Sequence, residues 1–143
     1  MNNFQIKKVE TEKELQQVFD IRKKVFIEGQ NVPSEIEMDN YDETSEHFIT
    51  YLNDISIGCA RIRQNDYIKL ERIAILKEYR NKGYGTKLTK WLINYCKQKK
   101  NREIMLHSQL YVVDFYKKFG FKKVGEIFDE AGIEHVKMIL TLF

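Results

Sequence analysis

A turn with two glycines, Arg80-Asn81-Lys82-Gly83-Tyr84-Gly85, lies between a run of β-branched residues and a run with helical periodicity. The first N–H groups of a helix have no partner within it, and the helix dipole adds positive potential, so such a turn can bind a phosphate. Gly83 and Gly85 permit backbone angles closed to other residues and let a phosphate approach the main chain. A tight strand-to-helix turn without a ligand is an equally good interpretation of the glycines alone.

Two common phosphate motifs do not account for this turn. A P-loop requires G-x-x-x-x-G-K-[ST], which the sequence lacks. A Rossmann dinucleotide site requires a third glycine near position 88, where Leu88 stands. A phosphate bound at this turn would therefore belong to a different kind of site.

Hydrophobic periodicity predicts the elements that position the turn. A first strand is followed by a helix that Thr11 caps, with Glu14 completing a capping box. A long acidic connection over 29–46 leads to an antiparallel hairpin and a third strand, which the turn joins to an amphipathic helix. The predicted strands span 4–9, 47–52, 56–64, 67–76, 103–107, 121–126 and 134–142, and the predicted helices span 11–28, the turn to about 99, and 112–119. This order predicts a mixed α/β layer, one domain over residues 1–143, and no doubly wound alternation.

The composition is that of a globular protein, with 43% hydrophobic and 31% charged residues. The formal net charge is only +3, and the basic residues at 97–102 suit a helix C-terminus better than a nucleic-acid patch. Cys59 and Cys96 fit no metal-ligand spacing and fall on predicted buried faces. Without a signal peptide or an apolar run of about 18 residues, we expect a cytoplasmic protein with reduced thiols, no membrane contact and no metal.

Two segments resemble the GNAT N-acetyltransferases. The run Leu70-Glu71-Arg72-Ile73-Ala74-Ile75 followed by Arg80-x-x-Gly83-x-Gly85 is similar to the family's acetyl-CoA signature, [QR]-x-x-G-x-[GA] after a strand. Downstream, Phe115-Tyr116-x-x-Phe119-Gly120-Phe121 resembles the family's Y-x-x-x-G-F segment. Together these segments cover about residues 56–126, in the family's order and separation.

Both ends of the chain resemble the ElaA-like branch of this family. The matching residues are Arg22-x-x-Val25-Phe26-x-x-x-Gln30, Val32-Pro33, Glu37-x-Asp39, His47, His107-x-Gln109-x-Tyr111 and Phe128-Asp129-Glu130-x-Gly132-Ile133-x-His135. The resemblance implies the GNAT acyl-CoA N-acyltransferase fold, a mostly antiparallel twisted sheet that is splayed at the cofactor site and flanked by helices.

The resemblance also implies that acetyl-CoA is the co-substrate and that its acetyl group passes directly to a primary amine of a small molecule or peptide. The strand would hold acetyl and pantetheine, the polar residues after the next strand would bind pantetheine amides, and the glycine turn would bind the pyrophosphate. The implied cofactor-binding residues are Ile73, Ala74, Ile75, Arg80, Asn81, Lys82, Gly83, Tyr84, Gly85, Thr86, Ser108 and Gln109.

Acetyl transfer needs proton transfer from the amine and to the departing thiolate. Tyr116 occupies the family's tyrosine position and is the implied general acid, although its spacing alone would indicate a core aromatic. Glu71 and His107 are the candidate bases, with deprotonation through a water chain as the alternative. Strand alternation predicts that Glu71 shares a face with Ile73 and Ile75.

No residue identifies the acceptor. Carboxylates of the acidic connection can border its pocket and favour a cationic amine, or they can be solvated or paired with Arg22 and Arg61. These carboxylates are Glu28, Glu37, Asp39 and Asp42. The alternative function is a non-catalytic acyl-CoA-binding sensor, and nucleic-acid binding is the least favoured. The apolar final strand can pair across a homodimer or simply complete the sheet.

Overall fold

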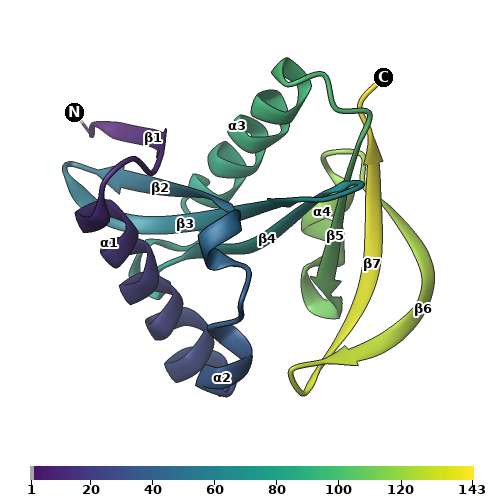
Figure 1. Ribbon diagram of the computed structural model, residues 1–143, viewed down its shortest axis with the longest axis horizontal. Helices are drawn as coiled ribbons and strands as arrows, with labels where there is room; N and C mark the ends of the chain where they lie inside the picture. The colour runs from purple at the N-terminus through teal and green to yellow at the C-terminus, as the bar shows by residue number, and fades with distance from the viewer. Residues whose placement is uncertain (1) are drawn as a thin grey trace.

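In the computed structural model, which describes residues 2–143, a single seven-stranded sheet has helices on both faces (Figure 1). The strand order is β1-β2-β3-β4-β5-β7-β6, and β4 with β5 is the parallel pair among antiparallel neighbours. The strands are β1 Phe4–Lys8, β2 Glu46–Leu52, β3 Ile55–Gln64, β4 Ile68–Ile75, β5 Glu103–Gln109, β6 Lys122–Glu130 and β7 Ile133–Thr141. The predicted mixed α/β layer and the predicted order of strands are confirmed.

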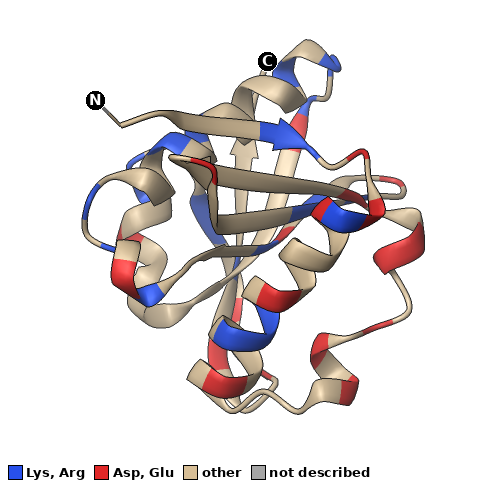
Figure 2. Ribbon diagram, turned by 90° about the vertical axis from the view of Figure 1, so that its left-hand side faces the viewer, with Lys and Arg blue, Asp and Glu red and all other residues tan. Residues whose placement is uncertain are grey.

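The main helices also begin where the sequence predicts. They are α1 Glu12–Arg22, α3 Tyr84–Gln98 and α4 Val113–Lys117, and a short α2, Ser34–Glu37, lies in the acidic connection. The capping box is present, since the Thr11 hydroxyl accepts from the Glu14 N–H and the Glu14 carboxylate accepts from the Thr11 N–H. The last part of the first predicted helix, Lys23–Glu28, has π-helical turns. Acidic residues recur along the connection from α1 to β2 (Figure 2).

The sheet separates two hydrophobic cores. The apolar stripe of α3, including Leu88 and Leu92, is fully buried against one face of the sheet. Val18 and Ile21 of α1 pack against the other face, so the two helices lie on opposite sides of the sheet (Figure 1). Burial of each such side chain contributes about 2 kcal/mol to the stability of the fold. The strand β4 lies between the two packed layers.

The sheet opens between β4 and β5. These strands pair only through Ile68 with Ile104 and Lys69 with Met105, and they then diverge (Figure 1). Within residues 2–143, the edge of β4 from Leu70 onward has no strand beside it on the β5 side. Backbone groups on such an edge are free to pair with an extended ligand.

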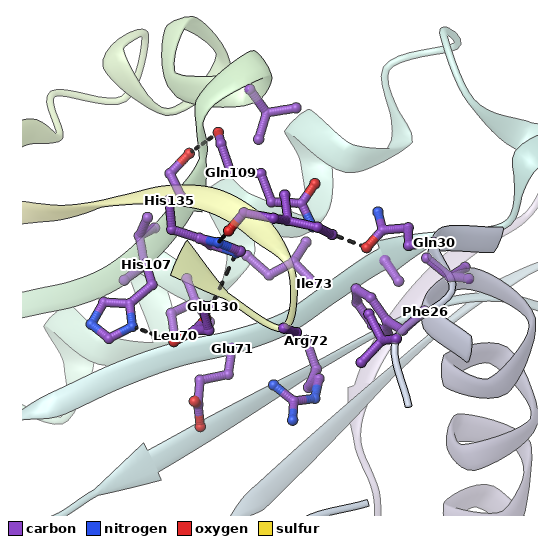
Figure 3. Close-up of a pocket in the computed structure, with 18 of the residues that line it drawn as sticks. Phe26, Gln30, Leu70, Glu71, Arg72, Ile73, His107, Gln109, Glu130 and His135 are labelled. Carbon is purple, nitrogen blue, oxygen red and sulfur yellow. Dashed lines mark hydrogen bonds and ion pairs between the residues drawn. The ribbon is translucent and has the colours of Figure 1, made fainter. Parts of the chain in front are cut away.

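A β-bulge in β4 overturns one prediction. The β3–β4 register shifts between Cys59 and Arg61, and Arg72 has a φ of 55°. As a result Glu71 and Arg72 project to the same side of β4 (Figure 3), while Ile73 packs toward the α3 core. The predicted alternation, with Glu71 on the face of Ile73, is wrong because the extra residue in the bulge reverses it.

The final strand lies inside the sheet. β7 pairs with β5 along one edge and with β6 along the other. Pairing of this strand across a homodimer is therefore excluded, and it completes the sheet instead. In the described part of the chain, the helices are all too short or too polar to cross a membrane.

Candidate active site

A cavity of about 620 Å³ lies where β4 and β5 separate. Figure 3 shows that side chains from β4, β5, β7 and the segment after α1 surround it. All three predicted catalytic residues, Tyr116, Glu71 and His107, line this cavity. The predicted cofactor-binding residues that also line it are Ile73, Ala74, Ile75, Arg80, Asn81, Ser108 and Gln109.

The glycine turn continues from this cavity into α3. Gly83 is the N-cap of α3 with a φ of 86°, and no side chain caps the helix. The first N–H groups of α3 therefore remain free for an anion. The Arg80 Nε donates to the carbonyl oxygen of Ile75 at 2.8 Å, which ties the turn to the end of β4. The predicted residues Lys82, Gly83, Tyr84, Gly85 and Thr86 form this turn and the first turn of α3, outside the lining of the cavity.

Glycine suits positions 83 and 85 of the turn for different structural reasons. Gly83 needs its left-handed backbone angle. Gly85 is helical, and a Cβ there would meet Phe115 Cζ at 3.8 Å and Ile75 Cγ1 at 3.9 Å, both ordinary contacts. The protein itself thus has room for a side chain at Gly85, on the side where two cavity-lining residues lie.

Tyr116 lies on α4 at the border of the cavity. Its ring packs edge-on against Phe115 and Phe121, with centroids 5.1 and 5.9 Å away. Burial raises the pKa of Tyr116, so the hydroxyl remains protonated at neutral pH. Tyr116 thus packs in the core, as its spacing alone indicates, and also lines the cavity; its role as general acid stays a prediction.

His107 is part of a cluster that the sequence did not predict. Its Nδ1 donates to Glu130 Oε1 at 2.9 Å, and Glu130 Oε2 lies 3.7 Å from His135 Nε2 (Figure 3). Because a carboxylate only accepts, the neutral imidazole of His107 carries its proton on Nδ1 and presents Nε2 as a proton acceptor. The hydrogen bond from His107 lowers the pKa of Glu130. Glu130 and His135 belong to the ElaA-like match near the end of the chain, but spacing did not indicate a role for them.

Glu71 is enclosed by cations. Its carboxylate lies 2.8 Å from Arg61, 3.2 Å from Arg63 and 3.1 Å from Lys69. Burial by itself would raise the pKa of Glu71, but attraction to Arg61 and Lys69 lowers it. The structure thus favours a paired carboxylate over a proton acceptor at this position.

The acidic connection also pairs with arginines. Arg22, which is fully buried, binds Glu37 at 2.9 Å and Asp42 at 2.7 Å. Arg61, also fully buried, binds Asp39 at 2.7 Å. The interpretation of these carboxylates as ion-pair partners of Arg22 and Arg61 is confirmed. The remaining carboxylate, Glu28, is exposed and lies outside the cavity lining.

These pairs predict acid sensitivity. Burial would raise the pKa of Asp39, but the hydrogen bonds from Arg61 and from the Tyr41 N–H, together with the attraction of Arg61 and Arg72, lower the pKa to about 2. Since an unfolded aspartate has a pKa of about 3.9, this pair stabilises the fold above that pH and is lost as pH falls toward 2. Asp39→Asn is expected to lower the free energy of unfolding by roughly 1–2 kcal/mol at pH 7 and to flatten its decline below pH 4. Urea unfolding from pH 2 to 7 measures this. The exposed Asp20→Asn is the control, and an unchanged pH slope in Asp39→Asn would contradict the prediction.

Both cysteines have surroundings that make them unreactive. Cys59 and Cys96 are buried and form no disulfide. Burial raises the pKa of the Cys59 thiol to about 12 and that of Cys96 to about 11. Because the thiolate is the nucleophile, both are core residues with little reactivity. In residues 2–143, the His, Cys, Asp and Glu side chains form no group of three suited to a metal ion.

Comparison with known proteins identifies the family. The family model described as "Acetyltransferase (GNAT) domain" matches residues 7–142, nearly the whole chain. The chain belongs to the GNAT acetyltransferase family. Among its relatives, the Bacillus subtilis protein named "Uncharacterized N-acetyltransferase YjcF" is 38% identical over 130 residues, which is 90% of this chain and 93% of that protein.

The GNAT fold and the ElaA-like resemblance are also confirmed. Protein ElaA of Escherichia coli is 27% identical over 131 residues, 87% of this chain and 86% of that protein. The ElaA crystal structure has a TM-score of 0.86 at 24% identity and covers 96% of this chain and 98% of its own. A GNAT family acetyltransferase from Elizabethkingia anophelis was solved with acetyl-CoA bound. Its structure has a TM-score of 0.79 at 19% identity, and the match covers 98% of this chain and 99% of that one.

This GNAT domain is an acetyltransferase whose cavity combines three chemical features. The edge of β4 offers free backbone groups, Tyr116 offers a protonated hydroxyl, and His107 with Glu130 offers an oriented imidazole. Together they can bind an extended acyl carrier, protonate a leaving group and accept a proton.

Proposed function

We propose that this GNAT domain transfers an acetyl group from acetyl-CoA directly to a primary amine. One observation carries the proposal: the edge of β4 at Ile73–Ile75, which within the described residues has no strand beside it on the β5 side, lines the same cavity as Tyr116 and His107. A thioester on that edge would have a proton donor and a proton acceptor within one site. The similar fold with acetyl-CoA bound supports this cofactor.

The cofactor would extend from the glycine turn to the opening of the sheet. Its pyrophosphate would accept from the free N–H groups at Tyr84, Gly85 and Thr86, with Arg80 and Lys82 adding positive charge. Its pantetheine arm would pair with the edge of β4 as an added strand does. Ser108 and Gln109, which line the cavity, would bind the pantetheine amides.

The reaction forms a C–N bond and breaks a C–S bond. The amine, once deprotonated, attacks the thioester carbonyl, and N–H groups of β4 stabilise the oxyanion of the tetrahedral intermediate. As the intermediate collapses, its nitrogen loses its remaining extra proton to solvent, the C–S bond breaks, and the departing thiolate takes a proton from Tyr116. Tyr116 then regains a proton from solvent. A thiol of pKa about 8.5 is a good leaving group once this proton is supplied.

We assign the general base to His107, with Glu130 orienting its ring. Glu71 is a weaker candidate, since three cations keep it ionised. His107→Gln is expected to lower kcat about 100-fold at pH 7, and Glu130→Gln about 10-fold. An alkylammonium has a pKa of about 10, so the deficit of His107→Gln should shrink as pH rises and free amine becomes abundant. A kcat profile from pH 7 to 10 measures this, and a deficit constant over that range would show a structural role instead.

Of the carboxylates that line the cavity, Glu130 is the one that we expect the acceptor amine to contact. Glu37, Asp39 and Glu71 line the cavity but already pair with arginine or lysine. Among the described residues, the groups within ion-pair distance of the Glu130 carboxylate are the imidazoles of His107 and His135, and the Glu130 side chain is 42% exposed. An ammonium group of a small molecule or peptide can therefore approach Glu130.

We place the reaction in the cytoplasm, where both unbonded cysteines remain reduced.

A thiol-release assay tests the proposed function. The purified protein is incubated with acetyl-CoA and a panel of polyamines, aminosugars and lysine peptides, and free CoA thiol and acetylated product are both measured. We expect product with at least one primary amine. Tight CoA binding with no release for any amine would favour the non-catalytic acyl-CoA sensor.

A further inference from the structure

Arg72 has a backbone conformation that its residue type disfavours. Its φ of 55° lies in the left-handed region, where a Cβ crowds the following carbonyl. The residue stands in the bulge of β4, three positions after pairing with β5 ends at Lys69. Such a conformation persists only where surrounding contacts hold it.

The contacts that hold the Arg72 side chain come from the acidic connection, and its carbonyl oxygen accepts from the Cys59 thiol of β3 at 3.6 Å. The Arg72 Nε donates to the Glu37 carboxylate, and its Nη2 donates to the Glu37 carbonyl at 3.1 Å and to Asp39 at 3.3 Å. A further donation reaches the carbonyl of Ile36 at 3.5 Å. One guanidinium is thus bound by two carboxylates and two carbonyls of one segment. We refer to Glu37, Asp39 and Arg72 as the bulge clamp.

The two carboxylates of the bulge clamp are also bound by arginines other than Arg72. Glu37 is 1% exposed, and its other carboxylate oxygen accepts from Arg22 of α1 at 2.9 Å. Asp39 accepts twice from Arg61 of β3, at 2.7 and 2.9 Å. Because both of these arginines are fully buried, the acceptors of Arg72 have little freedom to move.

We propose that the bulge clamp positions the edge of β4 that receives the acyl group, so that the acidic connection shapes the site and does not bind the acceptor. The backbone of Ile73 follows the bulge directly, and its N–H direction depends on the conformation of Arg72. Glu37 and Asp39 act through Arg72 and are positioning residues. The inference rests on the proposed function for its kinetic consequence.

Substitution of Arg72 separates positioning from direct contact with substrate. Glycine adopts a positive φ without cost, asparagine adopts it more readily than other residues, and alanine resists it. Arg72→Gly, Arg72→Asn and Arg72→Ala all remove the same guanidinium and the same ion pairs. We expect kcat within about 3-fold of the original for Gly, a lower value for Asn, and at least a 30-fold loss for Ala. The Kd for CoA should rise by a smaller factor than kcat falls in each variant, because the glycine turn that would bind the pyrophosphate is unchanged.

Hydrogen exchange gives a second readout that needs no acceptor. Exchange of the β4 amides that pair with β3 beside the bulge, such as that of Ala74 opposite Cys59, is expected to be fastest in Arg72→Ala and slowest in Arg72→Gly among the three variants. Should Arg72→Ala fail to fold, the same order between Gly and Asn carries the test. Equal loss of kcat in Gly and Ala would overturn the proposal and indicate that the guanidinium contacts substrate. Unchanged kcat and exchange in Ala would overturn it also. If the original protein acetylates no amine, the proposed function fails, and the exchange order alone decides whether the clamp holds the bulge.

Discussion

Tyr116→Phe is expected to lower kcat for acetyl transfer about 100-fold, which is the usual contribution of a general acid. The substitution removes one oxygen and keeps the ring, so its packing against Phe115 and Phe121 remains. Without the hydroxyl, the thiolate must leave unprotonated or take its proton from water. Because burial raises the pKa of Tyr116, the donor is present throughout the neutral range in the original protein.

The test measures steady-state kcat and the Kd for CoA in parallel. The Kd is expected to stay within about 2-fold, since the hydroxyl acts on the leaving group and the glycine turn supplies the anchor. Tyr67→Phe, at a tyrosine that is 52% exposed and outside the cavity lining, is the matched control. An unchanged kcat in Tyr116→Phe would mean that Tyr116 is only a core aromatic.

Gly85→Ala is expected to weaken CoA binding about 10- to 100-fold without loss of stability. A Cβ at this position makes only ordinary contacts with Phe115 and Ile75, and alanine is a better helix former than glycine by about 1 kcal/mol. The melting temperature should therefore stay or rise. The added methyl group would, however, occupy the space through which a pyrophosphate approaches the N–H groups of α3.

Calorimetric titration with CoA and thermal unfolding measure the two effects separately. Gly58→Ala is the matched contrast, because a Cβ there would lie 2.6 Å from Ile75 Cδ1 and 2.9 Å from the Ala74 carbonyl oxygen. It is expected to lower the melting temperature. Unchanged CoA affinity in Gly85→Ala would remove the glycine turn from the cofactor site.

Local sequence determined the frame of this protein. The capping box at Thr11, the glycine turn before α3 and the hydrophobic periods each depend on residues within a few positions of one another. Such patterns can be recognised without a fold, and they predicted the order of strands and main helices correctly. The family resemblance added the cavity residues, because the same motifs recur in proteins of the same fold.

The tertiary structure alone decided which groups meet. Glu130 reaches His107 across 23 positions, and Glu37 reaches Arg72 across 35. From the sequence, the carboxylates of the acidic connection could equally border a cationic substrate or pair with Arg22 and Arg61, and the folded chain shows that these buried arginines of α1 and β3 bind Glu37 and Asp39. The bulge at Arg72 placed Ile73 and Ile75 on the face opposite to Glu71, since one extra residue in a strand changes the direction of every later side chain. Local patterns specify where the chain turns, whereas the pairing of charges and the register of strands depend on distant segments that only the folded chain brings together.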